Sequence, residues 1–349
     1  MTKPQLGELL FADPSLSQPT GQACADCHAE RRAFIDPEGY STSTGAVAGR
    51  FGPRNSPTIL YAQYAPPLHR DPSGRFVGGL FWDGRVDTLE AQVEKPLLNP
   101  LEMNNPSKDS VVEAVRQGPY AARFRELFGP ASLDDIDAGF ARITEVLAAY
   151  ERTPALAPFS SKYDRYLAGK AILTEAETRG LAVFEDPAQG NCASCHPSRP
   201  SDGHPPLFTN FTYANLGVPR YANNKYYRLS PDLNPDGDRY IDRGLGATVG
   251  DSAQDGLFRV PTLRNITQTA PYGHNGYFEN LPHLLDFLNT RDIGSPTATG
   301  CPASATAPCA WPDPEVPATV DHDHVGHLGL AAASLDDLQA FLATLTDEP

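Results

Sequence analysis

The pentapeptide Cys24-Ala25-Asp26-Cys27-His28 occurs near the start of the chain, and the pentapeptide Cys192-Ala193-Ser194-Cys195-His196 occurs in its second half. Both have the pattern C-x-x-C-H, the attachment signature of c-type haem. Two thiols at this spacing can add to the two vinyl groups of one porphyrin, and the next residue offers an imidazole to the iron. A zinc site would need converging ligand pairs, and a thioredoxin-like motif lacks the trailing histidine. The motifs therefore predict two covalently bound haem c groups, with His28 and His196 as proximal ligands.

The length and composition fit one such haem in each half of the molecule. The chain has 349 residues, enough for two domains of ordinary size, and 40% of them are hydrophobic. The 34 prolines and 29 glycines indicate long loops, and no stretch alternates convincingly between polar and apolar residues. We therefore predict a mainly α fold of two cytochrome c-like domains, residues 1–160 and 161–349, each with long loops that wrap one covalently attached haem.

Several short helices are expected between the loops. The segments 132–135, 174–177 and 334–337 have the pattern of helix N-terminal caps, Ser/Thr followed three residues later by Asp/Glu. We expect long loops over 29–80 and 197–255. The expected helices are 5–12, 88–95, further turns and helices over 108–150 including 136–150, a helix ending near 184, 281–289 and 338–345.

The net charge of −15 limits the kinds of partner. Proteins that bind nucleic acid carry basic patches, and anionic membranes repel acidic surfaces, so we expect neither partner. A protein with a basic docking face would suit this charge, although the charge could equally serve only solubility.

Cys301 and Cys309 are the two cysteines outside the haem motifs, and they lie close together in a loop rich in Pro and Ala. They form either a disulfide, which exported proteins tolerate, or two free thiols. Covalent haem attachment implies export, so we expect a periplasmic protein. No apolar leader precedes Leu6, so we expect the sequence to begin after processing, and no apolar run is long enough to span a bilayer.

Together these motifs resemble the bacterial dihaem cytochrome c peroxidase and MauG superfamily over nearly the whole chain. The resemblance rests on many stretches in the right order. Besides the two haem motifs they are Leu6-Gly-x-x-Leu-Phe11, Arg54-Asn-Ser-Pro-Thr58, Phe81-Trp-Asp-Gly-Arg85, Asn99-Pro-Leu-Glu-Met103, Val260-Pro-Thr-Leu-Arg-Asn265, Thr269-Ala-Pro-Tyr-Gly-His-Asn-Gly276 and the terminal helix Leu338 to Leu345.

The resemblance implies that the first haem reacts with hydrogen peroxide. The family lines that pocket with a Gln, a Pro and a Glu, which match Gln92, Pro96 and Glu102. Splitting the O–O bond needs a base that takes a proton and an acid that returns it, and a carboxyl group in an apolar pocket can do both. Trp82 matches a family tryptophan between the haems and is implied to relay electrons, although it could simply pack there.

One departure concerns the oxidised state of the first haem. The peroxidases proper have a histidine in the loop before the Arg54 stretch that caps this iron, and residues 29–53 contain none. We therefore expect an open first haem, as in MauG. The resemblance also implies an inter-haem calcium site at Asn55, Thr269 and Pro271, a donor set suited to a hard cation.

A second departure concerns the sixth ligand of the second haem. The family places a Met or Tyr fourteen residues after the histidine that matches His274, and this position is Leu288, which cannot bind iron. Met103 belongs to the other pocket, and Met1 is the only further methionine. The iron is then five-coordinate, bound by water, or bound by another residue. The candidates are His283, His322, His324 and His327. The histidine-rich segment 321–327 could also form a surface metal site or, as we favour, a solvated loop.

The resemblance thus implies a dihaem oxidoreductase that reacts with peroxide through a ferryl intermediate and passes electrons through the second haem. The donor is a small cytochrome c or cupredoxin in a peroxide-removing enzyme, or a protein substrate in a MauG-like enzyme. A dihaem electron carrier without enzymatic activity is the remaining alternative.

Overall fold

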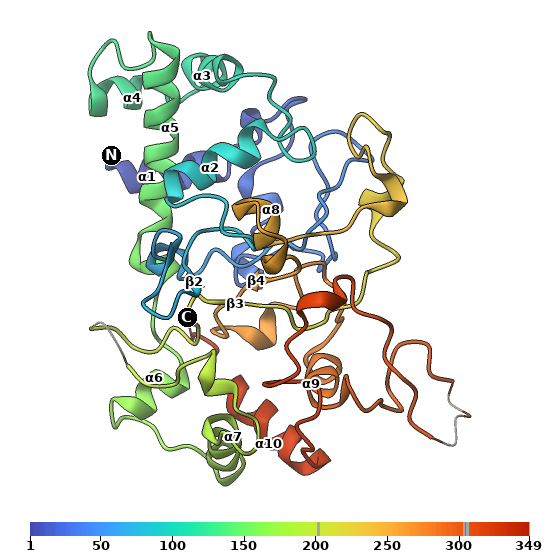
Figure 1. Ribbon diagram of the computed structural model, residues 1–349. Coiled ribbons are helices and arrows are strands. Elements are labelled where there is room, and N and C mark those ends of the chain that lie inside the picture. The colour runs from blue at the N-terminus through green and yellow to red at the C-terminus, as the bar shows by residue number, and fades with distance from the viewer. Residues whose placement is uncertain (201–202, 303, 305–306, 349) are drawn as a thin grey trace.

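The computed structural model describes residues 1–200, 203–302, 304 and 307–348. Its fold is mainly α, as predicted, with long loops between short helices (Figure 1). The helices of the first half lie at one end of the molecule and most of those of the second half lie at the other. The helices are α1 Lys3–Phe11, α2 Leu89–Leu98, α3 Lys108–Gln117, α4 Ala121–Phe128, α5 Ile136–Glu151, α6 Lys162–Leu167, α7 Glu175–Glu185, α8 Leu245–Val249, α9 Leu281–Thr290 and α10 Ala332–Ala343.

The described residues form two main hydrophobic cores. The first contains residues between Leu6 and Ala157 together with Leu207, and the second contains residues between Tyr163 and Leu345. Because each core lies beside one C-x-x-C-H motif, both halves bring apolar side chains to their own haem site.

Each core is built around one close helix pair. Helix α1 packs on α5, and α7 packs on α10. A Cβ added to Gly7 of α1 would overlap the carbonyl oxygen of Val146, and one added to Gly180 of α7 would overlap that of Asp337. Glycine therefore allows the helices in both pairs to approach backbone to backbone. In both halves a phenylalanine follows this glycine four residues later, and the haem motif comes next along the chain.

Several helix starts follow from caps visible in the sequence. The Thr174 hydroxyl accepts a hydrogen bond from the Glu177 backbone while the Glu177 carboxylate accepts one from the Thr174 backbone, which confirms this capping box. In the segment 132–135 the cap is Asp135, whose carboxylate accepts from the amide of Ala138.

The prediction for the last helix was wrong at its start. Helix α10 begins at Ala332, and Ser334 lies inside it rather than capping it. Alanine has the highest helix propensity, and residues 331–333 are all alanine, so the helix extends without a side-chain cap.

Four strands of two residues also occur. They form the antiparallel pairs β1 (His69–Arg70) with β2 (Phe76–Val77) and β3 (Tyr213–Ala214) with β4 (Phe258–Arg259). Strands this short leave no alternation to detect in a sequence. None of the helices in the described residues is long and apolar enough to cross a membrane.

A buried ion pair joins the two halves, and another lies within the second half. Arg54 of the first half lies 2.7 Å from Asp83 and 2.6 Å from Asp242 of the second half. Arg264 of the second half lies 2.7 Å from Asp164 and has a fully buried side chain. Each of these pairs holds its two side chains together, because either side chain alone would be a buried charge without an opposite charge beside it.

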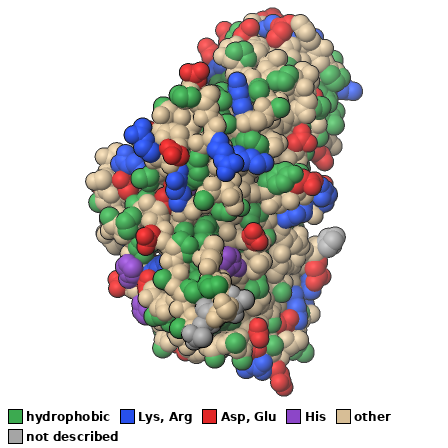
Figure 2. Space-filling model, turned by 90° about the vertical axis from the view of Figure 1, so that its right-hand side faces the viewer, with side chains coloured by type: hydrophobic (Ala, Val, Ile, Leu, Met, Phe, Trp, Pro, Cys, Tyr) green, Lys and Arg blue, Asp and Glu red, His purple; other side chains and the backbone are tan. Residues whose placement is uncertain are grey.

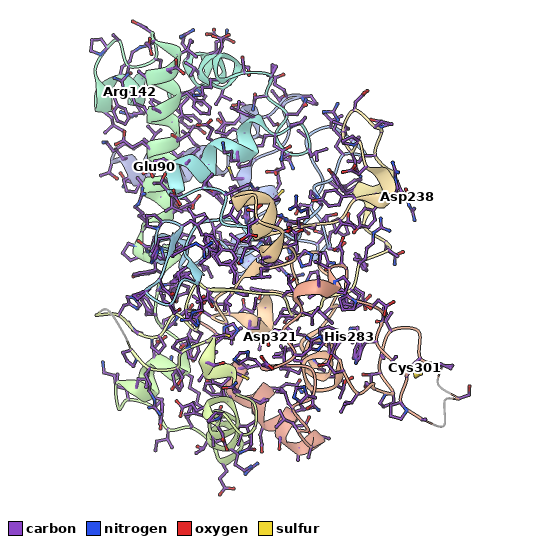
Figure 3. The ribbon with its side chains drawn as sticks, viewed as in Figure 1. Glu90, Arg142, Asp238, His283, Cys301 and Asp321 are labelled. Carbon is purple, nitrogen blue, oxygen red and sulfur yellow. A yellow bond between two sulfur atoms is a disulfide. The ribbon has the colours of Figure 1, made fainter. Side chains whose placement is uncertain are left out.

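The disulfide between Cys301 and Cys309 is present, which confirms the first of the two alternatives. It lies at the periphery of the molecule, in the loop that follows α9 (Figure 3). The backbones of Ser295 and Cys309 hydrogen-bond to each other beside it.

Candidate haem sites

Both C-x-x-C-H motifs fold into the same local structure. Cys24–Asp26 and Cys192–Ser194 each form a single 3-10 turn. The amide of the histidine then donates to the carbonyl of the first cysteine, at 3.0 Å for His28 and 2.9 Å for His196. The turn therefore brings two thiols and one imidazole together, as covalent haem attachment needs.

Each of these histidines is held in one tautomer by a backbone carbonyl. Nδ1 of His28 lies 3.0 Å from the carbonyl oxygen of Phe34, and Nδ1 of His196 lies 2.7 Å from that of Phe208. A carbonyl only accepts hydrogen bonds, so Nδ1 carries the proton and Nε2 has a free lone pair for a metal. Burial lowers the pKa of both rings, to about 4 for His196, which keeps them neutral.

The two phenylalanines that supply these carbonyls share an uncommon backbone conformation. Phe34 has φ 58° and Phe208 has φ 52°, in the left-handed region that bulky residues avoid. Such strain persists where the surrounding structure imposes it, and it often marks a functional site. The same strained contact at both motifs indicates the same task, which is to aim the imidazole.

An apolar cavity opens beside the second motif. Cys192, Cys195 and His196 line it together with residues of both halves. Helices α9 and α10 supply leucine side chains to its wall, which include Leu281, Leu284, Leu285, Leu288, Leu338 and Leu342. A porphyrin presents a large apolar face, so this lining fits a haem.

Arg259 adds a charged side chain to this otherwise mainly apolar cavity. Its guanidinium lines the same cavity, and burial lowers its pKa. Its Nε donates to the carbonyl of Phe81 at 3.2 Å, and no carboxylate of the described residues pairs with it. A haem carries two carboxylates, and a buried guanidinium without a counter-ion is a suitable partner for one of them. The sequence analysis did not identify Arg259, because nothing in the sequence distinguishes it from a surface arginine.

Asp321 of the second half also lies near this motif. The negative charge of Asp321 contributes to the raised pKa of the Cys195 thiol, although burial of the thiol is the larger cause. The segment that begins at Asp321 is therefore close to the edge of the cavity at which the second thiol would attach.

The residues implied for peroxide chemistry lie on α2 and in the turn that follows it. Gln92 and Pro96 lie four residues apart on α2 and share one face, while Val93 and Leu97 are buried in the first core. The amide of Met103 donates to the carbonyl of Pro96 at 3.2 Å, which turns the chain back after the helix. Glu102 lies in this turn.

Glu102 is held close to the first haem motif. Its Oε1 accepts a hydrogen bond of 2.6 Å from Nδ2 of Asn99, and its carbonyl accepts one of 2.8 Å from the amide of Ala46. Burial raises the pKa of the Glu102 carboxyl, and the Asn99 hydrogen bond opposes this shift in part. Its charge in turn contributes to the raised pKa of the Cys27 thiol, so the two groups are neighbours.

Trp82 connects the two halves. Its indole Nε1 donates to the carbonyl of Asn55 at 2.9 Å, and its own carbonyl accepts from the amide of Arg259 at 2.8 Å. The side chain of Trp82 lines the cavity of the second motif, although it belongs to the first half.

Asn55, Thr269 and Pro271 line this same cavity, although they are far apart in the sequence. The amide of Asn55 donates to the carbonyl of His274 at 2.7 Å, which ties the two segments together. The side-chain amide of Asn55 lies 3.4 and 3.3 Å from the carbonyls of Tyr40 and Ser41. Several carbonyl oxygens therefore surround it.

His274 is buried and stacks on Phe258, with 3.6 Å between the ring centroids. Its Nε2 is shielded from solvent, has no hydrogen-bond partner and lies 3.7 Å from the Glu315 carboxylate. Leu288 lines the cavity with an apolar side chain, so this wall lacks a metal-binding group at that position.

The four other candidate histidines lie in different places. His324 lines the cavity, and His283, His322 and His327 do not. His283 packs near Trp311 and Phe278, and His322 contacts Asp292. Within the part of the chain that the structure describes, no three His, Cys, Asp or Glu side chains are grouped to hold a metal ion, so segment 321–327 does not form the surface metal site that its sequence left open.

Comparison with known proteins identifies the family. Residues 1–172 match the family model described as di-haem cytochrome c peroxidase. Methylamine utilization protein MauG of Paracoccus denitrificans is 41% identical over 351 aligned residues, which cover 98% of this chain and 88% of that protein. Cytochrome c551 peroxidase of Nitrosomonas europaea is 30% identical, over 81% of this chain and 72% of that protein. The crystal structure of the diheme peroxidase BthA from Burkholderia thailandensis has a TM-score of 0.83 and 34% identity, over 99% of this chain and 86% of that one.

The fold and these similarities define a haem-dependent oxidoreductase of the peroxidase type. The chain belongs to the dihaem cytochrome c peroxidase and MauG family, and two haems are the cofactors of that family.

Proposed function

We propose that each half of the chain, residues 1–160 and 161–349, is a cytochrome c-like domain with one covalently attached haem c. The first haem reacts with hydrogen peroxide, and the second exchanges electrons with it. The observation that carries this assignment is the half-buried carboxyl group of Glu102, which is held by Asn99, has a raised pKa and lies close to the first motif. At the second motif, helices α9 and α10 supply leucines to the wall of the cavity.

Glu102 moves the protons of the reaction. Peroxide is a poor ligand until it loses a proton, and its distal oxygen is a poor leaving group until it gains one. A carboxyl group with a raised pKa can perform both steps near neutral pH. The haem, when bound, supplies the iron and the electrons for cleavage of the O–O bond. With a haem in place, Gln92 would be the hydrogen-bond donor toward peroxide, and Pro96 would limit the space beside it.

Trp82 is the electron relay between the two haems. Its position supports this role, because it contacts segments of both halves and lines the second cavity. Asn55, Thr269 and Pro271 bind a calcium ion between the haems, through the Asn55 side chain and two backbone carbonyls.

The oxidised first haem is open, and the reaction is MauG-like. Residues 29–53 contain no histidine that could cap this iron. The 41% identity to a protein named MauG supports the same proposal. The final electron donor is a side chain of a protein substrate, and the compartment is the periplasm. A small cytochrome c or cupredoxin is the donor in the alternative.

Net charge alone does not locate the docking surface. On the face drawn in Figure 2, basic side chains lie among acidic ones, so the charge of −15 is not spread evenly there. Charged residues at the edge of a docking surface mainly change the rate at which a partner protein associates and the dependence of that rate on salt.

Stopped-flow absorbance tests the proposal. The fully oxidised protein, loaded with haem, is mixed with one equivalent of hydrogen peroxide. We expect a rapid shift of the Soret band without prior reduction. If the spectrum stays unchanged until the protein has been half-reduced, the first iron has a sixth ligand and the enzyme follows the alternative cycle. Mass spectrometry of the same sample should find two covalent haems, and finding one would refute the two-haem architecture.

A further inference from the structure

The segment between Asp321 and Leu330 covers the end of α9 beside the second cavity. The amide of Gly326 donates to the carbonyl of Leu288 at 2.6 Å, and the amide of Leu328 donates to that of Asn289 at 3.1 Å. These bonds place the segment next to Leu288, the position from which the family supplies its sixth ligand. Asp321 lies in the interior of the view in Figure 3, whereas Cys301 lies at the edge.

A buried arginine holds the segment in place. The guanidinium of Arg291 donates to the carbonyl of Asp321 at 2.8 Å and to that of Val325 at 3.0 Å, and it also bonds to Leu216. The side chain of Arg291 is only 4% exposed. The backbone between Asp321 and Val325 is therefore fixed at both ends, while the side chain of His324 stays 52% exposed at the mouth of the cavity that it lines.

His324 is oriented as the two proximal histidines are. Its Nδ1 lies 3.0 and 2.9 Å from the two carboxylate oxygens of Asp321. A carboxylate accepts hydrogen bonds, so Nδ1 carries the proton and Nε2 has the free lone pair. A carboxylate behind a histidine is the usual arrangement for a metal ligand, because it fixes the ring and makes Nε2 more basic.

Other donors along the cavity are engaged elsewhere. The hydroxyl of Tyr61 donates to Asp347 at 2.7 Å, and that of Tyr272 donates to the carbonyl of Ile266 at 2.6 Å. His274 also lines the cavity, but its Nε2 is shielded from solvent and lies 3.7 Å from the Glu315 carboxylate. Met103 is buried in the core of the first half.

We propose that Nε2 of His324 is the sixth ligand of the second haem, in place of the side chain that Leu288 lacks, and that Asp321 positions it. The iron would then have two imidazole ligands, His196 on one side and His324 on the other. Two nitrogen ligands favour low-spin iron and give a lower reduction potential than a His/Met pair. This inference rests on the proposal that a haem occupies the second cavity.

Electron paramagnetic resonance of the fully oxidised holoprotein is the test. We expect a low-spin signal from the second haem that is lost in His324→Ala and replaced by a high-spin signal. Added imidazole should restore the low-spin signal in this variant. The matched control is His322→Ala, because His322 belongs to the same segment but contacts Asp292 and does not line the cavity. We expect the control to keep the wild-type spectrum.

A second variant covers the case in which His324→Ala fails to load haem. His324→Met keeps a ligand at the site, and we expect a sulfur-to-iron charge-transfer band and a raised midpoint potential in spectroelectrochemical titration. Asp321→Asn should keep the low-spin signal, but we expect competing ligands to displace His324 more easily in this variant than in the wild type. The readout of His324→Ala does not depend on the state of the first haem, because one low-spin signal is lost whether the first haem is low-spin or high-spin.

The possible failures are distinguishable. If mass spectrometry shows no second haem in the wild type, the proposed function fails, and the ligand assignment fails with it. If both haems are present and His324→Ala keeps every low-spin signal, only the ligand assignment is overturned. A wild-type protein with no low-spin haem overturns it as well.

Discussion

A carboxyl group with little access to water holds its proton to a higher pH than one in solution, and Glu102 is in this position. Asn99 hydrogen-bonds to one of its oxygens and fixes the direction of the group. These two features support the proposed role of Glu102 in proton transfer at the first haem.

Replacement of Glu102 by Gln removes this proton transfer and leaves the shape of the side chain almost unchanged. We expect Glu102→Gln to slow the peroxide-dependent Soret shift by about 10²-fold or more, the usual contribution of general acid–base catalysis. Stopped-flow absorbance measures the rate. Glu126→Gln, an exposed glutamate paired with Arg123, is the control and should react at the wild-type rate. An unchanged rate in Glu102→Gln would remove this residue from the mechanism.

The pH dependence follows from the direction of the pKa shift. Glu102 acts first as a base, so its carboxylate form is the active one in the free enzyme, and this form predominates above its pKa. Burial raises the pKa of Glu102 above 4.5. We therefore expect the rate of the Soret shift to rise with pH and to level off only above this raised pKa. The Glu102→Gln variant should show no such rise. A rate that already reaches its plateau below pH 4.5 would contradict the assignment.

At the residue scale, the sequence predicted those groups whose chemistry depends on local spacing. The C-x-x-C-H pentapeptides fold into turns that need few distant contacts, so His28 and His196 could be identified directly. Arg259 could not, because it is distinguished only by its lack of a counter-ion. His324 was one of four candidate histidines, and only the cavity, which is formed from distant segments, distinguishes it from the other three. The roles of Gln92, Glu102 and Trp82 came from resemblance and stay predictions.

At the element scale, the helix pairs α1–α5 and α7–α10 depend on glycine at the point of contact. Helix starts with a capping side chain were predictable, as at Thr174. The start of α10 was not, because alanine propensity extends the helix without a cap. The two-residue strands are set by tertiary pairing, which no local pattern encodes.

Gly180→Ala tests the contact in the second core. The new methyl group would overlap the carbonyl oxygen of Asp337, so α7 and α10 would have to separate. We expect a loss of about 1–3 kcal/mol in the free energy of unfolding, the usual cost of overpacking. Urea denaturation followed by circular dichroism measures it.

The control for this variant is Gly52→Ala. A Cβ at Gly52 would meet no heavy atom within 4 Å, and the backbone there is accessible to alanine. We expect its stability to stay within about 0.5 kcal/mol of the wild type. Equal losses in both variants would show that the contact at Gly180 is not the cause.

At the scale of the whole molecule, Arg54 is the buried cation between the two halves. It pairs with both Asp83 and Asp242. Burial by itself would raise the pKa of Asp242, but the charge and hydrogen bonds of Arg54 outweigh burial, and the pKa falls to about 2. The sequence showed Arg54 within a family motif, but its partner lies so far along the chain that no local pattern could reveal the pairing.

Arg54→Met leaves the buried Asp242 carboxylate without its partner, whereas Asp83 keeps its ion pair with Arg85. We expect a loss of about 3–5 kcal/mol in the free energy of unfolding, as found when one member of a buried ion pair is removed. Arg31→Met is the matched control, because its pair with Glu38 is mostly exposed, and it should cost no more than about 1 kcal/mol. Chemical denaturation of the three proteins gives the comparison, and similar losses in both variants would contradict it.

Trp82 and Asn55 belong to the first half of the chain but form part of the wall around the cavity of the second. The two halves resemble each other in design, yet they are not interchangeable modules, because one supplies part of the other's enclosure. A natural or engineered substitution near the first motif can therefore alter the absorbance of the more distant chromophore. The second half therefore does not retain a complete cavity when the first half alone is exchanged.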